Sequence, residues 1–169
     1  MKKKQKNFSW MNPKLEVRDT TKYGKGVYAK KMITKGENLA IFGGYVLKVG
    51  DEVNDSGIQI EENLVLSGLN NNEPTDYINH SCNPNSGIKG QNFIVSMNNI
   101  NKNEQITFDY AMCLFSLTKK ADYSFKCLCG EKNCRKLITS NDWKILSLQK
   151  KYKGYFQWYL QNKINKNAK

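Results

Sequence analysis

The feature that most limits how this chain can fold is a short run of thiols. Cys127, Cys129 and Cys134 form the pattern C-x-C-x4-C. The basic N-terminus is not followed by the long apolar segment of a secretory signal, so we expect an intracellular protein whose clustered thiols bind metal rather than form disulfides. Structural zinc usually has four protein ligands. The run therefore requires one further ligand from another part of the chain.

The composition favours a single small domain with a basic surface. The chain has 169 residues and a net charge of +12, and every basic residue except Arg18 and Arg135 is Lys. Arg has the planar geometry that suits phosphate and base recognition, so its scarcity disfavours specific nucleic-acid binding. A small basic zinc protein that binds nucleic acid remains an alternative, which steeply salt-dependent binding would reveal. No apolar run approaches the ~20 residues needed to cross a bilayer, which predicts no membrane association.

The charge is distributed unevenly along the sequence. Residues 49–88 contain no Lys or Arg but do contain Asp51, Glu52, Asp55, Glu61, Glu62, Glu73 and Asp76. Such a stretch is either an ordinary solvated acidic segment or a surface that receives a basic partner.

Turn residues divide the first part of the chain into short segments, which predicts a β-rich α+β domain. The expected strands are residues 15–18, 27–30, 38–42, 64–67, 93–97 and 105–108. After a possible helix cap at residues 140–142, apolar residues such as Ile145, Leu148 and Tyr152 follow a helical period. This predicts one or two amphipathic helices, with aromatic residues such as Trp143 and Trp158 packed in the core.

Four separated segments together resemble the SET domain with its post-SET zinc loop, over about residues 13–137. They are KYGKGVYA followed by ITKGE (from residue 22), YINHSCNPN (from residue 77), EQITFDY (from residue 104) and the thiol run. The resemblance implies a fold of short β-sheets around a knot-like core, in which the segment carrying Tyr110 passes beneath a loop near Asn79. A zinc-bound post-SET loop and a C-terminal helix would follow.

The resemblance also implies a binding site for S-adenosylmethionine, with S-adenosylhomocysteine as the product. A glycine-containing turn would approach the cofactor closely, because residues without a Cβ atom permit such an approach. His80 is the only histidine, and in this family the residue positions cofactor rather than transferring protons. The implied cofactor-binding residues are Tyr23, Gly24, Lys25, Gly26, Asn79 and His80.

Tyr110 is the catalytic residue that the resemblance implies, with Phe108 and Phe42 lining a channel for the substrate lysine. Phe108 occupies the family's Phe/Tyr switch position. Because Phe lacks the hydroxyl of Tyr, it leaves room for several methyl groups on the amine. We therefore expect di- or trimethylated lysine as product. The acidic stretch, including Glu61 and Glu62, would line the groove for a basic substrate such as a histone-like or ribosomal protein.

The same resemblance supplies the missing metal ligand. In SET proteins with a post-SET loop, the cysteine of the second segment joins the thiol run, which implies zinc bound by Cys82, Cys127, Cys129 and Cys134. Cys113 would be a small buried hydrophobic residue. The implied units are a basic lead over 1–12, the SET domain over 13–118, the post-SET loop over 119–137 and a helical extension over 138–169.

Two departures from the family pattern leave a second functional interpretation open. Asp76-Tyr77 stands where many eukaryotic members have Arg-Phe, and Phe42 replaces a channel tyrosine. These changes would suit a catalytically silent SET module that binds a peptide or partner, whereas the retained Tyr110 favours a protein-lysine methyltransferase. The compact build is similar to small bacterial SET proteins, which predicts a cytoplasmic enzyme, with delivery into a host nucleus as an alternative.

Overall fold

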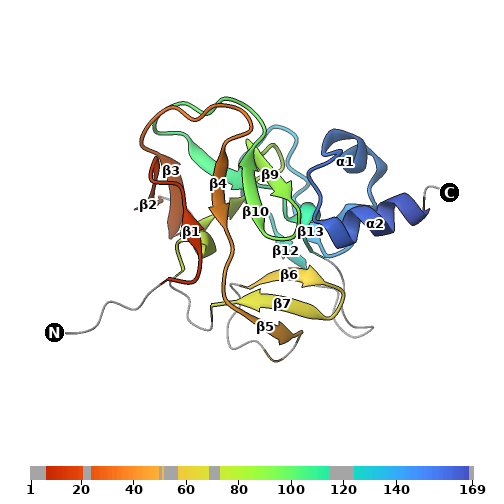
Figure 1. Cartoon of the computed structure of the whole chain (residues 1–169). Coiled ribbons are helices and arrows are strands. Elements are labelled where there is room, and N and C mark those ends of the chain that lie inside the picture. Colours follow the sequence, from red (N-terminus) through yellow and green to blue (C-terminus); the bar gives the residue numbers. More distant parts are fainter. Residues whose placement is uncertain are drawn as a thin grey trace.

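The computed structural model describes residues 7–20, 24–49, 51, 57–68, 73–114 and 124–167. Tyr23, expected to bind cofactor, lies outside these residues. Four small sheets and a few short helices make up the described part (Figure 1). The predicted β-rich α+β class is confirmed, and each of the six expected strands is present with its ends shifted by no more than two residues.

The first sheet has the strand order β1-β4-β10-β9 and is antiparallel throughout. Its strands are β1 (Trp10–Met11), β4 (Asn38–Ile41), β9 (Ser86–Lys89) and β10 (Phe93–Ser96). Leu39, Ile88 and Ile94 in these strands are fully buried. Strand β1 was not predicted, because the polar composition around it hides a two-residue strand.

The second sheet brings together the segments that carry the sequence motifs, in the order β2-β3-β11-β8. Its strands are β2 (Leu15–Asp19), β3 (Lys25–Ala29), β8 (Asn79–His80) and β11 (Gln105–Phe108). Strands β8 and β11 run parallel, with Thr107 opposite Asn79 and Phe108 opposite His80. This pairing places the second and third motifs side by side, as the expected crossing of the Tyr110 segment near Asn79 requires.

A third sheet, in the order β5-β7-β6, lies at the lower edge of the molecule in Figure 1. It consists of β5 (Tyr45–Lys48), β6 (Ile58–Glu61) and β7 (Leu64–Ser67), of which β6 and β7 lie within the acidic stretch. The two-stranded sheet of β12 (Ser124–Lys126) and β13 (Leu137–Thr139) flanks the thiol run.

The C-terminal segment packs on the remainder of the molecule through its aromatic side chains. This segment contains the 3₁₀ turn η3 (Asp142–Lys144) and the helices α1 (Leu146–Lys151) and α2 (Trp158–Asn167). Two further 3₁₀ turns, η1 (Pro74–Tyr77) and η2 (Tyr110–Met112), lie earlier in the chain. Trp143, Tyr152, Phe156 and Tyr159 belong to the core, as expected. Trp158 does not, because it begins α2 on the solvent side and is 62% exposed.

The expected cap at residues 140–142 also differs from the structure. Asn141 precedes η3 but makes no capping side-chain hydrogen bond. Asp142 instead accepts hydrogen bonds from Thr139 Oγ1 and Arg135 Nε, at 2.7 and 2.9 Å. The polar side chains of this turn therefore serve tertiary structure rather than the helix end.

The described helices are all too short or too polar to span a bilayer.

Part of the acidic stretch is structural rather than a free surface. The buried Glu73 carboxylate accepts hydrogen bonds from Phe8 N, Ser9 N and Ser9 Oγ at 3.1, 2.9 and 2.6 Å. Asp76 accepts the backbone N–H of Glu73, so the two side chains form a capping box at η1. The Glu73 carboxylate therefore holds the segment before β1 against the turn before β8.

We therefore expect Glu73→Gln to lower the free energy of unfolding by about 1–3 kcal/mol, because charge-assisted hydrogen bonds to a buried carboxylate are lost. Denaturant unfolding would measure the change. Glu16→Gln is the matched control: Glu16 pairs with Arg18 at the surface, and loss of an exposed pair should cost no more than about 1 kcal/mol. Equal effects in the two variants would contradict a structural role for Glu73.

Candidate functional site

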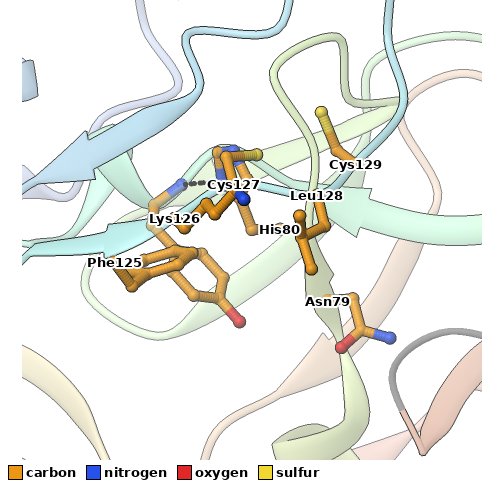
Figure 2. Close-up of a pocket in the computed structure, with 8 residues that line it drawn as sticks. Asn79, His80, Phe125, Lys126, Cys127, Leu128 and Cys129 are labelled. Carbon is orange, nitrogen blue, oxygen red and sulfur yellow. Dashed lines mark hydrogen bonds between the residues drawn. The ribbon is translucent and has the colours of Figure 1, made fainter.

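The candidate site lies where β8, the end of β11 and the thiol loop meet. A pocket at this point is lined by Asn79, His80, Tyr110, Phe125, Lys126, Cys127, Leu128 and Cys129. Figure 2 shows the pocket, with Phe125 on one side and Asn79 on the other. The structure thus brings residues of three sequence motifs to one cavity.

The glycine turn reaches the same place through its backbone. Asn79 Nδ2 donates to the carbonyl oxygen of Lys25 at 2.9 Å. A Cβ atom on Gly26 would lie 2.4 Å from Gln105 Nε2 and 3.2 Å from Asn79 Nδ2, so a side chain at this position would require Gln105 to move. Gly24 has a φ of +73°, which glycine adopts without strain. The Lys25 side chain lies over Tyr77, with Nζ 5.3 Å from the centre of the ring.

His80 has a defined set of partners in the folded protein. Its Nδ1 accepts the backbone N–H of Tyr110 at 3.2 Å, which places the proton of a neutral ring on Nε2, 3.3 Å from Cys82 Sγ. Burial lowers the pKa of His80 to about 4, so the ring is neutral near pH 7. A neutral ring held at both nitrogens suits a positioning role better than proton transfer.

Tyr110 begins the helical turn η2 immediately after β11. The Asp109 side chain caps this turn by accepting Ala111 N at 3.0 Å. The Tyr110 hydroxyl lies 3.5 Å from the carbonyl oxygen of Ile78. Two motifs that are far apart in sequence therefore supply two oxygens that lie close together, and one of them belongs to Tyr110, which lines the pocket.

Aromatic rings surround Tyr110. Ring centroids of Phe108, His80 and Phe125 lie 5.0, 5.2 and 5.9 Å from that of Tyr110. Phe42 is one ring further away and packs edge-on against Phe108 at 6.4 Å. Both predicted channel residues thus join the cluster, Phe108 directly and Phe42 through Phe108.

Sequence reasoning missed Phe125. It lies on β12 and contributes both to the ring cluster and to the pocket wall. The available signal was an aromatic residue two positions before the first Cys of the thiol run. That signal is weak, since only tertiary structure turns the loop toward Tyr110.

The four predicted metal ligands converge on one point. The Sγ atoms of Cys82, Cys127, Cys129 and Cys134 all lie within 4.8 Å of one another. Four thiolates around Zn²⁺ at about 2.3 Å would be about 3.8 Å apart, and Cys82 Sγ and Cys127 Sγ are separated by 3.9 Å. Geometry and ligand type both fit a closed tetrahedral zinc site.

The thiols of the cluster differ in pKa. Burial raises the pKa of Cys82 to about 11, whereas the backbone N–H of Lys136 lowers the pKa of Cys134 to about 7. Without a cation, buried thiols of this kind stay protonated, and a divalent metal removes the penalty by binding thiolates. Cys113 is buried in the main hydrophobic core, as expected, and is not part of the cluster.

Comparison with known proteins identifies the fold. The SET domain model matches residues 24–111, slightly more than half of the chain. The chain belongs to the SET-domain family. The predicted SET fold is confirmed by two crystal structures of KRYPTONITE, both with a TM-score of 0.60.

Several curated relatives carry histone-lysine methyltransferase names. The putative histone-lysine N-methyltransferase ASHH4 of Arabidopsis thaliana is 32% identical over 144 residues, which cover 74% of this chain and 39% of the relative. Trithorax of Drosophila virilis is 29% identical, covering 69% of this chain and 3% of the relative. The chain thus spans less than half the length of these relatives.

The KRYPTONITE structures are complexes. One contains mCHG DNA and SAH, with 26% identity covering 73% of this chain and 28% of that chain. The other contains mCHH DNA, an H3(1-15) peptide and SAH, with 25% identity covering 75% and 30%. One of these two structures therefore holds SAH and a histone peptide together.

We expect wild-type protein to contain one zinc ion per chain and Cys82→Ala to contain far less, because three thiols leave an open coordination position. Elemental analysis after gel filtration would measure the metal content. Cys113→Ala is the matched control and should keep the metal, since this thiol is buried outside the cluster. Full zinc content in Cys82→Ala would contradict the ligand assignment.

Proposed function

We propose that this SET domain transfers a methyl group from S-adenosylmethionine to the side-chain amine of lysine in a basic protein. The observation that carries the proposal is the Tyr110 hydroxyl beside the Ile78 carbonyl, at a pocket surrounded by aromatic rings. The family membership and the SAH-containing relatives support it.

The pocket residues suit the cofactor in shape and in polarity. Bound S-adenosylmethionine supplies a methyl group on a positively charged sulfonium. Gly24 has open space where a side chain would begin, Asn79 and His80 border the cavity, and residues 125–129 form its other wall. Gln105 Nε2, beside Gly26, is buried and finds no hydrogen-bond partner among the described residues, so it leaves a donor for a ligand.

The lysine amine must be neutral to accept a methyl group, although the free side chain has a pKa of about 10.4. A dry channel walled by Phe108, Tyr110 and Phe125 disfavours the ammonium form, since burial penalises charge. The Tyr110 hydroxyl and the Ile78 carbonyl can then align the amine and make weak C–H···O contacts with the methyl group. Alignment of this kind can lower a barrier by about 7–11 kcal/mol in favourable cases.

Zinc, in this proposal, has a structural role. Bound by Cys82, Cys127, Cys129 and Cys134, it would join the motif after β8 to the loop after β12. All four positions would be filled by thiolates, which leaves none for a reacting group. The chain's own thiols would therefore order the wall of the pocket that contains Phe125.

The substrate is proposed to be a basic protein such as a histone or a ribosomal protein, supported by the H3(1-15) peptide in a KRYPTONITE complex. The acidic stretch gives this less support than its composition suggested. Glu73 and Asp76 bond within the protein, and Glu62 forms an ion pair with Lys163 on α2. A silent binding module is disfavoured because Tyr110 keeps an ordered place at the pocket.

We expect Tyr110→Phe to lower kcat about 100-fold while leaving the melting temperature nearly unchanged, because the ring stays and only the aligning hydroxyl is lost. Mass spectrometry of histones and basic cellular proteins incubated with S-adenosylmethionine would measure lysine methylation. Tyr155→Phe, the same chemical change outside the pocket, should retain activity. Tight SAH binding with no methylation by wild-type protein would instead favour the silent module.

Phe108→Tyr should shift the product toward monomethyl-lysine. The new hydroxyl would lie beside the amine, since the Phe108 and Tyr110 rings are only 5.0 Å apart, and would restrict rotation of a methylated amine. The ratio of mono-, di- and trimethylated peptide at equal substrate conversion reports the effect. Product ratios unchanged from wild type would refute the proposed role of Phe108.

A further inference from the structure

The buried carboxylate of Asp109 connects the site to the C-terminal part of the chain. Asp109 is completely inaccessible to solvent. Its Oδ1 accepts Ala111 N at 3.0 Å and Arg135 Nη2 at 2.7 Å. Its Oδ2 accepts Arg135 Nη1 at 2.6 Å and the Tyr152 hydroxyl at 3.1 Å. Four donors from three segments thus surround the residue that precedes Tyr110.

Arg135 links this carboxylate to the thiol loop. It follows Cys134 directly, and its backbone N–H points at Cys82 Sγ at 3.4 Å. Its guanidinium binds Asp109 through two parallel hydrogen bonds and Asp142 through Nε at 2.9 Å. A planar fork is needed for this arrangement, which a lysine could not reproduce.

Tyr152 makes the same connection from the end of α1. Its hydroxyl lies 3.1 Å from Asp109 Oδ2 and 3.3 Å from the carbonyl oxygen of Cys82, and its side chain is buried. Tyr152 and Asp142 lie beyond residues 24–111, the part that matches the SET domain. The extension therefore contacts both the residue before Tyr110 and a predicted zinc ligand.

Movement of Arg135 would be transmitted to the pocket wall. Residues after Arg135 form β13, which pairs with β12 so that Leu137 lies opposite Lys126 and Ile138 opposite Phe125. Cys127 N also donates to Lys136 O at 2.7 Å. The loop side of the pocket is thus attached to Asp109 through Arg135.

We propose that Arg135 and Tyr152 are positioning residues, which hold the pocket wall at Phe125 to Cys129 and the turn that begins at Tyr110 in their working arrangement through Asp109. The C-terminal extension is then a required part of the site. The expected effect on catalysis rests on the proposed methyl transfer, whereas the expected effects on hydrogen exchange and on SAH affinity do not.

The test compares Tyr152→Phe with Tyr159→Phe in the full chain. Both tyrosines are buried, and the hydroxyl of Tyr159 donates to Cys113 O at 2.6 Å, outside the Asp109 cluster of Asp109, Arg135, Asp142 and Tyr152. Each variant thus loses one hydroxyl in the same helical region. Hydrogen exchange of free protein, SAH affinity by calorimetry, and kcat and KM on a basic peptide provide separate readouts.

In Tyr152→Phe we expect faster exchange in residues 124–137 and SAH affinity weaker by about tenfold, the order of loss for a hydrogen bond to a charged group. kcat should fall while KM for the peptide changes little. Tyr159→Phe should lose thermal stability without these changes. Arg135→Lys should resemble Tyr152→Phe, because it keeps the charge but not the paired hydrogen bonds.

Equal changes in both tyrosine variants would show a general stability effect and overturn the proposal. Unchanged exchange in residues 124–137 of Tyr152→Phe would overturn it as well, as would faster exchange with unaltered SAH affinity. If wild-type protein binds SAH but methylates nothing, the proposed function fails, while exchange and affinity still decide the positioning role.

Discussion

The interaction on which the site most depends is the ion pair between Asp109 and Arg135. A carboxylate with no solvent access is unstable unless hydrogen-bond donors replace its water, and Asp109 has four such donors. Breaking a buried pair by removing one partner typically costs about 3–5 kcal/mol. The hydrogen bonds to Asp109 require the thiol loop and the end of α1 to pack against the start of η2. This packing also fixes the position of Tyr110.

This constraint cooperates with the backbone pairing of β8 and β11. The parallel pair sets Asn79 and His80 beside Thr107 and Phe108, and His80 Nδ1 accepts the N–H of Tyr110. His80 Nε2 in turn faces Cys82 Sγ. One backbone ladder, one buried charge and one neutral imidazole therefore define the relative positions of the turn that begins at Tyr110, the pocket and the thiol cluster.

The sequence predicted the parts of this arrangement that have a local signal. Gly, Asn and Pro punctuate the expected strands, and the thiol run marked the metal loop. Strands such as β8, with only two residues, have no periodicity to detect. Nothing in the local sequence pairs Asp109 with Arg135 or directs Phe125 toward Tyr110, because both depend on segments meeting in space. The solvent-exposed Trp158 shows the converse, because aromatic content alone does not place a side chain in the core.

The acidic stretch illustrates how composition differs from available charge. Glu73 is buried against the N-terminal segment, Asp76 caps its turn, and Glu62 faces Lys163. Among the described residues of the stretch, Asp51 and Glu61 remain as exposed carboxylates outside these contacts. Surface charge of this size mainly alters association rates. In the proposed function, selection of a lysine substrate would therefore rest on the aromatic rings of Phe108, Tyr110 and Phe125, which suit a long apolar stem that ends in a neutral amine.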